Sequence, residues 1–220
     1  MKKFLFTYIL LSIVVIAVKL LELQQLENYL KPLLMPILMG FYLLSKKPST
    51  TFDYKILFAL LFSTIGDILL MPVVDYFLGG LMGFLIAHIF YISAFLSEKK
   101  TPLKSIDNWK KAILVIGIIT YFSLLLLLYP KLDSLVLQIA IIVYASILLS
   151  LLIISIIRAP KNPKSSDLIV IGAFLFLLSD GMIALNKFVF PIPAEALFIM
   201  GTYTLAQALL VYGSLSRNEQ

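Results

Sequence analysis

Residues 111–129 read KAILVIGIITYFSLLLLLY, and the only charged side chain among them is the first, Lys111. The stretch contains an uninterrupted leucine run, Leu124 to Leu128, so its polarity does not alternate as it does along a membrane β-strand. A helix needs about 20 mostly apolar residues to cross roughly 30 Å of hydrocarbon. The stretch therefore predicts a transmembrane helix.

Other stretches of the chain have a similar length and composition. Together they predict eight spans, approximately at residues 4–21, 30–45, 54–71, 76–97, 111–129, 134–157, 167–187 and 194–215. The connections are short, so we expect a single transmembrane domain over residues 1–220, an all-α polytopic helix bundle. The N-terminal run also resembles a signal peptide, but no convincing cleavage site follows it, and we interpret it as the first span.

The composition excludes several classes of protein. Hydrophobic residues make up 61% of the chain and charged residues 14%, whereas a soluble domain is about 25% charged. A soluble enzyme, a disordered chain and a free nucleic-acid binder are therefore excluded. There is no cysteine and one histidine, which excludes disulfides, cysteine-ligated metals and sites built from several histidines. We expect no metal and no cofactor.

The distribution of positive charge predicts the orientation. The 18 lysines and arginines lie on one side of the predicted membrane, except for Lys19, Lys31, Lys131 and Lys187. Cytoplasmic loops carry the excess of these residues, so both termini are expected in the cytoplasm, as an even number of spans requires. The basic loop at residues 99–111 is expected to contact anionic membrane lipids rather than nucleic acid.

Two carboxylates lie inside otherwise apolar spans. Asp67 belongs to the third predicted span and Asp180 to the seventh, at matching distances from the cytoplasmic ends of their spans. A charge at mid-bilayer costs at least about 2.5–3.5 kcal/mol, so such residues usually have a function. We expect the two carboxylates to face one cavity, where one is protonated and the other ionised.

Polar residues on the same or neighbouring spans are candidates for supporting the pair. They are Lys31, Ser63, His88, Tyr91, Ser179, Asn186, Lys187, Tyr203 and Gln207. Ser63 shares a helix face with Asp67, as Ser179 does with Asp180. His88, Tyr203 and Gln207 could instead serve helix packing alone, and Ser63 and Ser179 could instead bond to their own helix backbone.

A buried acid next to an anion suits three classes of function. These are acid-assisted hydrolysis of a lipid, proton-coupled transport and intramembrane aspartyl proteolysis. The protease is disfavoured, because Thr64 replaces the first glycine of a Gly-x-Gly-Asp motif and the partner motifs are absent. A zinc amidase of the alkaline ceramidase type is excluded by the single histidine.

Five motifs, in order along the chain, resemble those of the YhhN-like lysoplasmalogenase family. They are KPLLMP at 31–36, FSTIGDILL at 62–70, GFLIAHIFY at 83–91, the segment 172–187 and YTLAQ at 203–207. The resemblance implies an integral-membrane hydrolase of the vinyl ether bond in lysoplasmalogens. It would release a fatty aldehyde and glycerophosphoethanolamine or glycerophosphocholine.

The chemistry fits the two carboxylates. A neutral Asp can protonate the vinyl ether, and an ionised Asp can stabilise the resulting cation and orient water. Asp67 and Asp180 are the predicted catalytic pair, and either could be the acid. Lys31 and Lys187, near the outer mouth, could attract the phosphate of the substrate. The alternative is a proton-coupled transporter or lipid-binding membrane protein that uses the same pair. The membrane would be the cell membrane of a bacterium or an internal one, such as the endoplasmic reticulum, of a eukaryote; headgroup preference and oligomeric state stay open.

Overall fold

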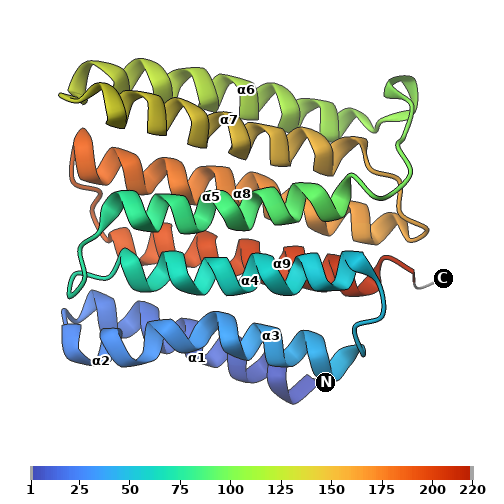
Figure 1. Ribbon diagram of the computed structural model, residues 1–220, viewed down its shortest axis with the longest axis horizontal. Helices are drawn as coiled ribbons and strands as arrows, with labels where there is room; N and C mark the ends of the chain where they lie inside the picture. The colour runs from blue at the N-terminus through green and yellow to red at the C-terminus, as the bar shows by residue number, and fades with distance from the viewer. Residues whose placement is uncertain (1, 219–220) are drawn as a thin grey trace. The chain divides into compact units, whose positions relative to one another are not determined.

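The computed structural model describes residues 2–218, and the regular secondary structure of this part is helical. This confirms the all-α prediction. The chain forms two compact units, which divide between Ser97 and Glu98. Figure 1 shows the helices of each. That the whole chain is one domain stays a prediction.

Unit 1 covers the N-terminal part of the chain. Its elements are α1 (Lys2–Leu20), α2 (Gln24–Leu30), the 3-10 turn η1 (Lys31–Leu33), α3 (Leu34–Ser45), α4 (Thr51–Leu69) and α5 (Phe77–Phe95). Helix α1 packs against α2 and α3, α3 packs against α4, and α4 has its most extensive contact with α5. The predicted second span thus begins as a 3-10 turn, in which Pro32 occupies a position that needs no backbone donor.

Unit 2 covers the rest of the described chain. Its elements are the 3-10 turn η2 (Leu103–Ser105), α6 (Asn108–Leu128), the 3-10 turn η3 (Tyr129–Lys131), α7 (Leu135–Ile157), α8 (Pro163–Phe188), the π-helical turn η4 (Ala196–Met200) and α9 (Gly201–Ser216). Helix α8 is central, because it contacts α6, α7 and α9. The predicted eighth span therefore starts with a π-turn, which the sequence did not reveal.

Side-chain caps fix where the two helices that carry the aspartates begin. Thr50 and Asp53 form a reciprocal capping box at the start of α4. Asn162 accepts the backbone N–H of Lys164 at 3.0 Å, and Pro163 takes the first position of α8. Both helices therefore start at a defined residue, which sets the height of every side chain above it.

Asp53 also ties α3 to α4. One carboxylate oxygen accepts the Tyr42 hydroxyl at 2.8 Å and the Lys46 ammonium at 2.7 Å. The other accepts the Thr50 hydroxyl at 2.7 Å and the backbone N–H groups of Ser49 and Thr50. Burial alone would raise the pKa of Asp53, but these hydrogen bonds outweigh it and hold the pKa well below the ordinary 3.8.

Arg158 plays the corresponding part in unit 2. Its guanidinium is 0% exposed, donates to Glu98 at 2.6 Å, and donates to the backbone and the hydroxyl of Ser165 at 3.2 Å. Burial lowers the pKa of Arg158, and the contact with Glu98 opposes that shift. The loop before α6, the end of α7 and the start of α8 are thereby held together.

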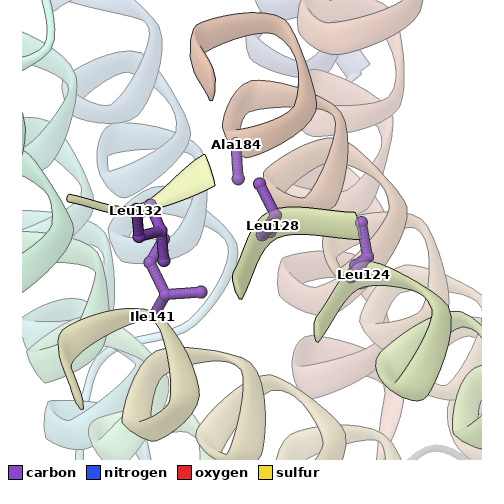
Figure 2. Packing of buried hydrophobic residues seen from close by; sticks show 5 residues of the cluster. All are labelled: Leu124, Leu128, Leu132, Ile141 and Ala184. Atoms are coloured by element: carbon purple, nitrogen blue, oxygen red, sulfur yellow. The ribbon is translucent and has the colours of Figure 1, made fainter. Parts of the chain in front are cut away.

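An apolar cluster closes the opposite end of unit 2. Figure 2 shows its members, Leu124, Leu128, Leu132, Ile141 and Ala184, converging from α6, the turn after η3, α7 and α8. Aliphatic side chains packed in this way exclude water.

Within the described residues, five helices are long and apolar enough to cross a membrane. They are α5, α6 continued through η3, α7, α8, and α9 together with η4. Helix α1 contributes the shorter apolar segment Phe4–Leu20. Helices α3 and α4 are not among the five. Helix α3 has 12 residues, roughly 18 Å long, and α4 carries three charged residues, Asp53, Lys55 and Asp67. The chain is therefore a multi-pass integral membrane protein, whereas the count of eight spans stays a prediction.

Candidate functional site

Asp67 lies on α4 near the end of the helix and is only 3% exposed. Ser63, one turn earlier on the same face, is fully buried. A carboxylate with so little access to water has its charge governed by the side chains around it rather than by solvent. The predicted intramembrane position of Asp67 is consistent with this burial.

Two glycines bring α5 close to this part of α4. A Cβ atom added to Gly83 would lie 2.9 Å from the Cα and the backbone nitrogen of Gly66. One added to Gly66 would lie 2.7 Å from the ring of Phe84. Only hydrogen fits at either position, so the helix backbones touch beside Asp67. Helix α5 then presents His88 and Tyr91, both fully buried, on the following turns.

A tyrosine that was not among the predicted residues completes this group. Tyr8 of α1 is buried and lies close enough to Asp67 and Tyr91 for electrostatic interaction with both. The structure thus brings α1, α4 and α5 together around one carboxylate. The hydroxyl of Tyr8 inside the apolar first span was the available signal.

Lys31 is buried in η1, and this turn packs against α4. The structure thus places an amine in the turn that adjoins the helix of Asp67. Its predicted role, attraction of a phosphate, stays a prediction.

Asp180 lies on α8 in unit 2 and is 7% exposed. The hydroxyl of Tyr144, on α7, donates a hydrogen bond to its Oδ2 atom. Tyr144 is as buried as Asp180 and was not among the predicted residues. A Cβ atom on the neighbouring Gly181 would lie 2.7 Å from Leu124, so α6 also packs tightly beside this carboxylate.

Ser179 connects this site to the π-turn. Its hydroxyl donates to the backbone carbonyl of Ile199 at 3.1 Å. Ile199 belongs to η4, where the wider backbone spacing frees carbonyl groups from the regular helical pattern. Such turns occur often at functional sites, and here the turn is anchored by the residue next to Asp180.

Tyr203 and Gln207 lie on successive turns of α9 and are both buried. The ring of Tyr203 meets that of Phe176 edge to face, with centroids 5.6 Å apart. Phe176 precedes Asp180 by one turn of α8. Unit 2 thus gathers Ser179, Asp180 and Tyr203, together with Tyr144, as unit 1 gathers Ser63, Asp67 and Tyr91.

Asn186 and Lys187 lie at the end of α8. Asn186 donates to the carboxylate of Glu195 and accepts the backbone N–H of Ile192 at 2.7 Å, so it holds the loop between α8 and η4. Lys187 is exposed at the same end. Glu195 was not among the predicted residues; it is the second residue of the predicted eighth span, where a carboxylate is typical of a span end.

Asp67 in unit 1 and Asp180 in unit 2 are therefore buried carboxylates inside predicted spans, each close to a tyrosine. A carboxylate of this kind can give or take a proton in a site that excludes water. Among the described residues, no group of three or more side chains is placed to hold a metal ion. The two aspartates belong to different units, and their pairing stays a prediction.

Comparisons with known proteins identify a family and several relatives of this chain. The sequence model of the YhhN family matches residues 26–214. A Homo sapiens protein named lysoplasmalogenase TMEM86A is 32% identical over 189 residues, which cover 82% of this chain and 72% of its own length. The Mus musculus lysoplasmalogenase TMEM86B is 34% identical over 158 residues, which cover 71% of this chain and 62% of its own. No solved structure matches the chain.

Proposed function

Because the chain belongs to the YhhN family, we propose that it is a lysoplasmalogenase, an integral-membrane enzyme that hydrolyses the vinyl ether bond of lysoplasmalogens. The products are a fatty aldehyde and glycerophosphoethanolamine or glycerophosphocholine. The names of its relatives support this activity.

The observation that carries the proposal is that Asp67 on α4 and Asp180 on α8 are buried carboxylates far from the starts of their helices, each close to a tyrosine. Asp67 and Asp180 lie at nearly the same height above the caps Thr50 and Asn162, roughly 25–27 Å at 1.5 Å per residue. We propose that they meet in one wet pocket and share a proton. Placing either charge in lipid alone would cost at least about 2.5–3.5 kcal/mol.

The reaction needs an acid and a base in turn. The neutral Asp protonates the β-carbon of the vinyl ether, which gives an oxocarbenium ion that the ionised Asp stabilises. Water adds to the cation and passes its proton to the ionised Asp. That Asp then returns the proton to the glycerol oxygen as the hemiacetal C–O bond breaks. The hemiacetal hydroxyl gives its proton to the first Asp, so one water is consumed and both carboxyl groups are restored.

The remaining polar residues would position the reactants. We assign Lys31 and Lys187 to the phosphate of the lysophospholipid. Hydrogen bonds to water, to the pair or to the glycerol hydroxyl are assigned to Ser63, His88, Tyr91, Ser179, Asn186, Tyr203 and Gln207. The hydrocarbon chain would enter sideways between helices. We assign no metal and no cofactor to the reaction.

The membrane arrangement is part of the proposal. Eight spans would cross the membrane as a single domain with both termini in the cytoplasm, as the positive charges predict. Helices α4 and α8 would then run in the same direction, which brings the two carboxylates to one level.

The test uses purified protein in detergent with a lysoplasmalogen of either headgroup. Aldehyde release is expected without an ion gradient and in the presence of a chelator. Asp67→Asn and Asp180→Asn should each lower kcat by about 10²–10⁴-fold or more. Asp133→Asn, which alters an exposed carboxylate in the loop before α7, is the matched control and should leave kcat unchanged.

Two results would contradict the proposal. Full turnover by a folded Asp67→Asn or Asp180→Asn variant would remove that residue from the chemistry. Failure of the wild-type protein to release aldehyde from both headgroups would favour the proton-coupled transporter.

A further inference from the structure

Helix α2 buries a charged side chain and exposes apolar ones. Glu27 is only 5% exposed, whereas Leu26 and Tyr29 close to it in sequence are exposed. A helix on a surface that faces water shows the reverse pattern. Exposed apolar side chains suit the boundary between lipid headgroups and hydrocarbon, where an amphipathic helix keeps its apolar face in the lipid. The pattern therefore indicates that α2 lies at the level of the lipid headgroups.

Two cations accompany Glu27. The ammonium group of Lys19, in the last turn of α1, lies 3.9 Å from Oε1 of Glu27. Lys31 follows Glu27 by one turn, donates its backbone N–H to the carbonyl of Glu27, and is itself buried. Side chains four positions apart lie on the same face of a helix. The buried side of α2 thus combines one carboxylate with two ammonium groups.

Two buried oxygen atoms at this place lack a hydrogen-bond donor within residues 2–218. They are Oε1 of Glu27 and Oδ1 of Asn28. The ion pair of Glu27 with Lys19 is longer than a hydrogen bond and does not supply the donor. Buried polar atoms are nearly always hydrogen-bonded, and an unsatisfied one lowers stability. Two such acceptors indicate a ligand that brings N–H groups of its own.

The charged side of α2 lies at the end of unit 1 that holds Asp67. Helices α3 and α4 are joined by a short loop and pack against each other, so η1, which precedes α3, contacts α4 near its end. Asp67 lies two residues before the end of α4. Figure 1 shows α2 and the end of α4 at the same end of the unit. A headgroup bound beside α2 would therefore leave the rest of the lipid on the side of Asp67.

We propose that Glu27 and Asn28 bind the ammonium group of an ethanolamine headgroup, while Lys19 and Lys31 bind its phosphate. This inference rests on the proposed function and adds headgroup selectivity to it. The ammonium of ethanolamine has N–H donors for the two acceptors, whereas the quaternary ammonium of choline has none and meets Glu27 by charge alone. Cationic and anionic side chains side by side complement the phosphate and the amine of the headgroup.

Steady-state kinetics of the purified full chain in detergent test this selectivity. The KM of the wild-type protein should be about tenfold lower for 1-alkenyl-glycerophosphoethanolamine than for 1-alkenyl-glycerophosphocholine. Glu27→Gln should raise the KM for the ethanolamine substrate about tenfold and leave kcat nearly unchanged, because Glu27 contacts no reacting atom. For 1-alkenyl-glycerophosphate, which has no amine, the KM should stay the same or fall, since the variant removes a charge that repels phosphate.

Glu22→Gln is the matched control, because Glu22 is an exposed carboxylate in the loop between α1 and α2. This variant should change none of the three KM values. A wild-type protein without preference for ethanolamine would overturn the proposal. An equal rise of KM for all three substrates in Glu27→Gln would also overturn it, because such a rise marks a structural role.

Binding without turnover separates this inference from the proposed function. The saturated ethers 1-alkyl-glycerophosphoethanolamine and 1-alkyl-glycerophosphocholine lack the vinyl bond, so this chemistry does not cleave them. Calorimetric titration should show about tenfold tighter binding of the former, and Glu27→Gln should abolish the difference. Equal binding of the two by a protein that releases aldehyde would overturn the inference alone. The expected difference in a protein that releases no aldehyde would overturn the proposed function alone.

Discussion

The hydroxyl of Ser179 donates to the carbonyl oxygen of Ile199, 3.1 Å away in the π-turn that opens the last span. Ser179→Ala should leave this buried carbonyl without its side-chain partner and lower the free energy of unfolding by about 1 kcal/mol. Activity should fall as well, since Asp180 is the next residue. Thermal unfolding in detergent and aldehyde release measure the two effects.

The control for this variant is Ser150→Ala. The Ser150 hydroxyl donates to the carbonyl of Ser146 within α7, so its removal breaks no link between elements. Equal losses of stability in the two variants would show that the bond to Ile199 has no special part in holding the π-turn.

The contact between α4 and α5 predicts a strong effect of a single methyl group. Gly83→Ala would place a Cβ atom 2.9 Å from the backbone of Gly66, so the helices must separate. We expect a loss of about 1–3 kcal/mol in stability and a clear fall in kcat, because Asp67 adjoins the contact. Gly201→Ala is the control, since nothing lies within 4 Å of the added methyl group. Wild-type behaviour of Gly83→Ala would contradict the close contact.

Asp53 predicts a dependence of stability on acid. Its pKa in the folded protein lies below the ordinary 3.8, so its contribution is present at neutral pH and is lost progressively as the pH falls below about 4. Asp53→Asn should therefore be less stable than wild type at pH 7, by about 1–3 kcal/mol, and the difference should shrink in acid. Unfolding curves at several pH values measure this difference. A difference that is constant with pH would show that the carboxylate charge is not responsible.

Arg158 predicts the effect of breaking a buried ion pair. Arg158→Met should lower the free energy of unfolding by about 3 kcal/mol, because Glu98 is left without its cation. The double variant Glu98→Gln with Arg158→Met should recover part of the loss, as coupled residues do. Lys161→Met, at an exposed site in the next loop, should be nearly neutral. Additive effects of the two substitutions would argue against the pair.

The long helices and their approximate ends could be predicted from the apolar runs, because a bilayer imposes a minimum length on each span, whereas the short helix α2 was not predicted. The second and the last span differ from the prediction in how they begin. Pro32 turns the start of the former into a 3-10 turn, and residues 196–200 of the latter form a π-turn that hydropathy alone does not reveal.

The two aspartates were visible in the sequence because a charge in an apolar run stands out. Tyr8 and Tyr144 were not, since a tyrosine in a span is typical of packing or of the membrane interface, and its partner depends on how the helix is rotated. The rotation of a helix follows from packing details such as the close approach of Gly66 and Gly83, which depends on side-chain size and on which residues of the two helices lie opposite each other.

The meeting of Gly66 and Gly83 has a further consequence. Two backbones in direct contact cannot slide past each other without a clash, so the vertical position of Asp67 is set by main-chain geometry and not by any adjustable side chain. Under the proposed function, a change of substrate would then be accommodated by the side chains around Asp67, while the carboxylate itself keeps its depth.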